Sequence, residues 1–85
     1  MTLRYLVNQL HGLSVNGEFN GVRFSKKELA DYIRNMFRTP LLNNRLVMTV
    51  VLPDGEWYFW IKRRGRGWDY WIPETREQEN NTVWF

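Results

Sequence analysis

The most chemically suggestive stretch of this chain is KRRGRG, at residues 62–67. It brings Lys62, Arg63, Arg64 and Arg66 together around two glycines. Guanidinium groups suit phosphate binding because their fork of N–H donors matches two phosphate oxygens. Glycine allows the backbone of such a stretch to turn tightly. The sequence therefore predicts a basic hairpin loop that contacts phosphate groups.

Aromatic side chains flank this basic stretch, and four of the five tryptophans lie between Trp57 and Trp71. An exposed ring beside a cation can stack a nucleic-acid base, which contributes about 1–3 kcal/mol per base. A pair of lysines at the start of a predicted helix adds phosphate contacts, since helix N-termini favour anions. The predicted nucleic-acid-binding residues are Lys62, Arg63, Arg64, Arg66, Tyr58, Trp60, Trp71, Lys26 and Lys27.

Residues for catalysis, metal binding or cofactor binding are sparse. The chain has no cysteine and a single histidine, His11, so it offers neither a thiolate nucleophile nor a histidine metal cluster. No glycine-rich phosphate fingerprint is present. We therefore predict a protein that is not an enzyme and that has no cofactor or metal. The alternative is a small ribonuclease that works by positioning and charge stabilisation. Its candidate residues are Tyr58, Arg63, Arg64 and Tyr70.

Length and charge narrow the class of protein. A chain of 85 residues fits one domain. The net charge is +3, and residues 74–85 hold three glutamates against one arginine, so the rest of the chain is more basic than the total indicates. A basic surface favours polyanionic partners. The lack of cysteine, of a signal peptide and of a long apolar run favours a cytoplasmic protein without a membrane partner.

The basic stretch belongs to a predicted three-stranded antiparallel meander over about residues 45–72. The strands are expected at Arg45–Leu52, Glu56–Lys62 and Trp68–Ile72, because these runs are rich in β-branched and aromatic residues. Pro53-Asp54-Gly55 and residues 63–67 form the turns between them. Large aromatic side chains point to both faces of this sheet. One face is therefore the core, and the other is either covered or a contact surface.

The register of the first hairpin has two solutions. A two-residue Asp54-Gly55 turn places even-numbered residues 46–52 on the face of odd-numbered residues 57–61, which makes one face wholly apolar. A three-residue loop over 53–55 moves Tyr58 and Trp60 onto the face of the even-numbered residues instead. It also keeps the proline out of the pair that closes the turn. The apolar pattern favours the first solution.

The main helix is predicted at about residues 25–38. Ser25 and Glu28 match a capping box, apolar residues then recur at helical spacing from Leu29 to Phe37, and the Thr39-Pro40 step ends the helix. Before it, the spacing of Leu3, Leu6, Val7 and Leu10 favours a short helix, with a strand as the alternative. Two Asn-Gly turns between residues 13 and 24 indicate a small hairpin or an irregular loop.

These elements predict a single α+β domain over residues 1–73, with the main helix packed on the meander. A polar tail follows at 74–85 and ends in Val83-Trp84-Phe85, which either docks on the open sheet face or binds elsewhere. The predicted function is nucleic-acid binding, to DNA or RNA, through the basic loop and the sheet aromatics. The alternative is a protein-binding inhibitor or adaptor of a larger complex, such as a phage- or plasmid-encoded anti-defence protein, or a homodimer formed through the sheet.

Overall fold

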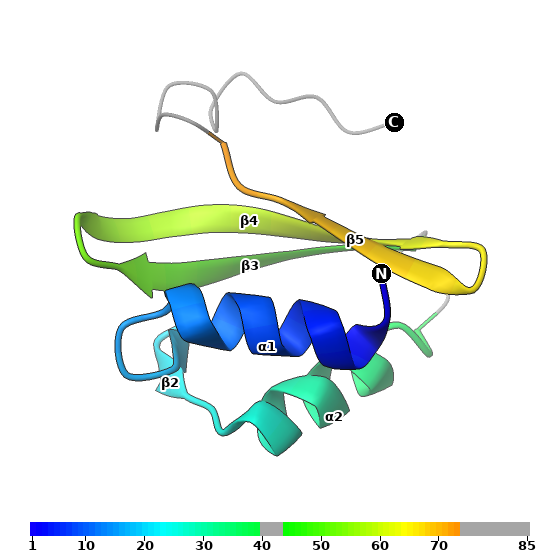
Figure 1. The fold of residues 1–85 in the computed structure, drawn as a ribbon, viewed down its shortest axis with the longest axis horizontal. Helices are drawn as coiled ribbons and strands as arrows, with labels where there is room; N and C mark the ends of the chain where they lie inside the picture. Colours follow the sequence, from blue (N-terminus) through cyan, green and yellow to red (C-terminus); the bar gives the residue numbers. More distant parts are fainter. Residues whose placement is uncertain (40–43, 74–85) are drawn as a thin grey trace.

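An antiparallel sheet forms one layer of this α+β fold, and two helices form the other (Figure 1). The computed structural model describes residues 1–39 and 44–73. The helices are α1 (Leu3–Leu13) and α2 (Lys26–Met36). The strands are β1 (Glu18–Phe19), β2 (Val22–Arg23), β3 (Arg45–Leu52), β4 (Gly55–Arg64) and β5 (Gly67–Trp71), and their spatial order is β2-β1-β3-β4-β5.

The meander β3-β4-β5 confirms the predicted strand alternation but not the predicted turn residues. Leu52 pairs with Gly55, so the turn between β3 and β4 consists of Pro53 and Asp54. Both expected turns, over 54–55 and over 53–55, are therefore wrong. Proline suits this turn position because its ring already fixes φ and because no backbone N–H is needed there for strand pairing. Gly55, the first residue of β4, takes a φ of +133°. Even-numbered residues of β3 still share a face with odd-numbered residues of β4, as the apolar pattern favoured.

The core lies between that apolar face and the two helices. Both helices cover the same side of the meander and run antiparallel to each other (Figure 1). The fully buried side chains include four from the helices and four from the meander. They are Leu6, Leu10, Leu29, Ile33, Met48, Val50, Phe59 and Ile61. We call this side of the sheet the helix face, and the opposite side the outer face.

The sheet has five strands rather than the predicted three. The chain between the helices forms a hairpin around Asn20 and Gly21, whose φ values of +51° and +74° suit the Asn-Gly pair. This hairpin joins β3 because Phe19 pairs with Val50 and because Asn20 exchanges hydrogen bonds with Thr49. The strands are two residues long, so sequence alternation could not reveal them. Phe19 is nevertheless fully buried and extends the core.

The N-terminal segment is a helix, as its spacing favoured, and its start is tied to the far edge of the sheet. The Met1 nitrogen donates to the Trp68 carbonyl at 2.9 Å, and the Trp68 N–H donates to the Met1 carbonyl at 2.7 Å. The Tyr70 N–H, two residues along β5, donates to the Asp69 carboxylate at 2.9 Å. Backbone groups of an edge strand are thus already bonded, which disfavours pairing with another strand here.

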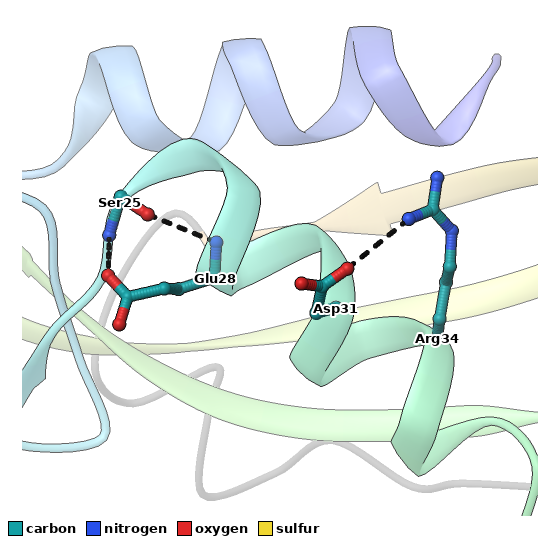
Figure 2. Close-up of polar contacts among 4 residues, drawn as sticks. All are labelled: Ser25, Glu28, Asp31 and Arg34. Carbon is teal, nitrogen blue, oxygen red and sulfur yellow. Dashed lines mark hydrogen bonds and ion pairs between the residues drawn. The ribbon is translucent and has the colours of Figure 1, made fainter.

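The capping box of α2 is present as predicted, and Figure 2 shows Glu28 reaching back to Ser25. The Ser25 N–H donates to the Glu28 carboxylate at 2.9 Å, and the Glu28 N–H donates to the Ser25 hydroxyl oxygen at 3.1 Å. The helix spans Lys26–Met36, with Phe37 as its C-cap, and is therefore slightly shorter than predicted. The cap fixes where α2 starts and hence which of its side chains face α1.

This cap makes stability depend on pH. The Ser25 backbone N–H, and secondarily its hydroxyl, hold the pKa of Glu28 below its ordinary value. A lowered pKa in the folded state stabilises the protein above the unfolded pKa, and this stabilisation is lost as the pH falls through the folded value. The free energy of unfolding should therefore decrease below about pH 4 less steeply in Glu28→Gln than in the unmodified chain. Urea unfolding at several pH values measures this.

Ser25→Ala is the matched comparison, since it removes only the hydroxyl and keeps both the carboxylate and the backbone N–H that is the first cause of the lowered pKa. It should flatten the same part of the pH profile less than Glu28→Gln does. An unchanged profile in both variants would contradict the assigned role of the cap.

The predicted polar tail over 74–85, with its terminal apolar triplet, lies outside the residues that the structure describes. Within the described ranges, neither helix is long and apolar enough to cross a membrane.

Candidate nucleic-acid interface

The basic stretch at 62–66 is divided between the two faces of the sheet. Strand β4 continues to Arg64, and only Gly65 and Arg66 form the turn, with Gly65 at a φ of +56°. Because side chains alternate along a strand, Lys62 and Arg64 lie on the outer face and Arg63 lies on the helix face. The predicted loop is therefore not one cluster of cations.

On the outer face an acidic residue offsets part of the charge. Asp69 pairs with Lys62 across the strands, and its carboxylate lies 3.4 Å from the Arg64 guanidinium. Both members of the ion pair are well exposed, so the pair contributes little to stability. It does lower the net positive potential that Lys62 and Arg64 present together.

On the helix face Arg63 is held over an aromatic ring. Its guanidinium carbon lies 4.4 Å from the centroid of the Trp68 ring, a cation–π contact. The Arg63 Nε–H donates to the Gly65 carbonyl at 3.2 Å, which uses one of the five guanidinium N–H groups. Trp68 is only 7% exposed and meets Phe37 edge-to-face at 4.8 Å. The ring is thus a fixed support that orients Arg63.

Next to this contact lies a cavity of about 220 Å³. We call it the arginine cavity. Its lining residues are Arg34, Phe37, Arg38, Asn44, Arg63 and Trp68. Three arginines and an asparagine supply hydrogen-bond donors, two aromatic rings supply an apolar wall, and none of the described lining residues is acidic. Among the described residues, the carboxylate of Asp31 lies 3.5 Å from the Arg34 guanidinium and is well exposed (Figure 2). The arrangement favours an anion.

A second basic depression, of about 560 Å³, runs between the two helices. We call it the interhelical groove. It is lined by Leu3, Arg4, Val7, Asn8, Lys26, Lys27, Ala30 and Arg34. The predicted pair Lys26 and Lys27 therefore belongs to a larger site. Arg34 lines both the groove and the cavity, so the two depressions adjoin each other.

Arg4, Arg34 and Arg38 were not among the residues predicted from the sequence. A signal for one of them exists, because Lys26, Ala30 and Arg34 recur every four residues and so share one face of α2. Arg38 follows the end of this helix. Arg4 lies on a different helix, and only the packing of α1 against α2 reveals that it belongs here.

Some of these cations lie toward one end of the molecule. The N-terminus of α1, the C-terminal end of α2 and the turn between β4 and β5 lie together there, as Figure 1 shows. The Met1–Trp68 and Phe37–Trp68 contacts confirm this proximity. Lys26 and Lys27 lie at the other end of α2.

The predicted stacking residues lie on the outer face, away from the arginine cavity. Tyr58 is 43% exposed and Trp71 is 47% exposed, whereas Trp60 is 4% exposed. The Trp60 and Trp71 rings stack on each other with centroids 4.7 Å apart. Trp71 and Tyr58 therefore present ring area, and Trp60 mainly supports Trp71. The structure does not bring these rings together with Arg63, Lys26 or Lys27.

The residues that the structure describes contain no group of three or more acidic, histidine or cysteine side chains that could hold a metal ion. His11 Nε2 lies 2.9 Å from the Phe24 carbonyl oxygen and so ties α1 to the segment before α2. The four ribonuclease candidates are split, because Tyr58 and Arg64 lie on the outer face while Arg63 and Tyr70 lie on the helix face.

Comparison of the chain with protein-family models, with curated proteins and with solved structures finds no match, so the functional argument depends on this geometry.

Proposed function

We propose that this protein binds nucleic acid through its helix side, with the strand backbone in the interhelical groove. One observation carries the proposal: cations from α1, from α2 and from β4 line two adjoining depressions. These cations are Arg4, Lys26, Lys27, Arg34, Arg38 and Arg63. Contiguous cations along a track match the regular charge of a phosphate backbone.

The length of the interhelical groove matches a nucleic-acid backbone better than a single small anion. Lys26 and Arg34 both line the groove and lie eight residues apart on α2, which is about 12 Å at the helical rise. One strand of a duplex carries a phosphate every 3.4 Å or so along its axis. The groove therefore spans about three or four phosphates. The positive end of the α2 helix dipole, near Lys26 and Lys27, adds to the attraction.

This function predicts a steep dependence on salt. If the four cations that line the groove each neutralise one phosphate, the logarithm of the affinity for single strands should fall against the logarithm of salt concentration with a slope of roughly −3, at about −0.7 per contact. Fluorescence anisotropy with short DNA and RNA, single- and double-stranded, measures the slope. Arg34→Gln should make it shallower by about 0.7.

The control for that titration is Arg23→Gln, because Arg23 lies on β2 and does not line either depression. Its slope should equal that of the unmodified chain. Affinity that is weak at low salt, or that does not change with salt, would contradict a nucleic-acid function.

A second candidate function is protein binding through the outer face. Val47, Trp60 and Trp71 form one row across β3, β4 and β5, and Val47 and Trp71 are both exposed, as is Tyr58 nearby. Exposed aromatic rings are typical anchors of protein interfaces. The alternative of an inhibitor, an adaptor or a homodimer would use this row. Protein binding becomes the leading candidate if fluorescence anisotropy does not change when nucleic acid is titrated at low salt.

A further inference from the structure

We propose that the arginine cavity binds the terminal phosphate of a nucleic-acid strand, an inference that rests on the function proposed above. The strand would lie in the interhelical groove and end at the cavity. Arg34 lines both sites, so a backbone that reaches Arg34 in the groove ends next to the cavity.

The donors of the cavity fit a phosphate group with more than one negative charge. Arg34, Arg38 and Arg63 approach it from α2, from the segment after α2 and from β4, while Asn44 adds an amide. A phosphodiester within a strand carries a single charge, whereas a phosphomonoester carries about −1.5 to −2 at pH 7. Three guanidinium groups around one small space therefore match a strand end better than an internal phosphate.

The size of the cavity also supports a terminal phosphate as its ligand. Its volume of about 220 Å³ is smaller than the roughly 300–1,000 Å³ of pockets that enclose drug-sized molecules. It therefore suits a phosphate group more than a whole nucleotide. The Trp68 ring beneath Arg63 keeps one guanidinium in place before the ligand arrives, and such preorganisation lowers the cost of binding.

The test compares single-stranded oligonucleotides of one sequence that carry a 5′-phosphate, a 3′-phosphate or two hydroxyl ends, with the fluorophore on an internal nucleotide. The oligonucleotide with a phosphate at the preferred end should bind about ten-fold more tightly than the one with two hydroxyl ends at about 50 mM salt, since that end adds one phosphate contact. Excess inorganic phosphate should reduce that preference. The end that is preferred also gives the direction of the strand in the groove.

Two matched variants distinguish the cavity from the groove. Arg38 lines only the cavity and is exposed, so Arg38→Gln should fold and should abolish the preference for the phosphorylated end. Lys27 lines only the groove, so Lys27→Gln should weaken all three oligonucleotides alike. Equal affinity for all three ends, or a preference that survives Arg38→Gln, would overturn the cavity assignment and leave the nucleic-acid function standing. An absence of binding by every oligonucleotide at low salt would overturn both.

Discussion

Replacing Phe59 with alanine is expected to destabilise the fold by about 3–5 kcal/mol. The Phe59 side chain is fully buried, pairs across the sheet with Met48, and meets Phe19 edge-to-face at 6.0 Å. Its removal leaves a cavity between the meander and the helices that neighbouring side chains can fill only in part. A chain of this length has a small margin of stability. Most of the cooperative unfolding transition should therefore be lost, as measured by urea denaturation with tryptophan fluorescence.

Tyr58→Ala is the matched control, because Tyr58 precedes Phe59 on the same strand and is 43% exposed on the outer face. This substitution should lower the free energy of unfolding by no more than about 1 kcal/mol, as is typical of surface substitutions. The contrast between adjacent positions tests which face of β4 belongs to the core. Comparable losses in the two variants would contradict the register described here.

The second large effect concerns the side of the molecule that we propose to bind nucleic acid. Neutralising the helix-face pair, Arg34→Gln with Arg63→Gln, should weaken binding about 100-fold at about 50 mM salt, since each phosphate contact contributes about ten-fold there. Neutralising the outer-face pair, Lys62→Gln with Arg64→Gln, removes the same formal charge. It should weaken binding by less than about ten-fold, because neither Lys62 nor Arg64 lines the groove or the cavity. Each pair includes one exposed ion pair with an aspartate, so this offset is matched between the two variants.

The design separates the two locations because the variants have equal net charge. Thermal unfolding of both double variants checks that the loss of the Arg63–Trp68 contact does not itself unfold the chain. A greater loss in the outer-face pair would move the interface to the outer face, beside Trp71 and Tyr58. That result would restore the arrangement that the sequence predicts, with cations and stacking rings on one surface.

Local patterns were sufficient for much of the fold. The capping box at Ser25 and the apolar repeat after it locate α2, because both depend on residues within a few positions of each other. The strands of the meander follow from β-branched and aromatic runs between turn residues, and the helix face of the sheet follows from period-two alternation. The turn at Pro53 and Asp54 was missed because several turn lengths suit the same residues.

Only the tertiary structure shows which of the proposed binding residues lie on one surface. Lys62, Arg63, Arg64 and Arg66 are neighbours in sequence, yet strand alternation sends Arg63 to the side opposite Lys62 and Arg64. Conversely, Arg4, Arg34 and Arg63 are distant in sequence and come together only because α1, α2 and β4 pack around one core. The charge pattern along the chain thus led to the proposal of a polyanionic partner, while the packing of buried side chains far apart in sequence decided which cations share a surface.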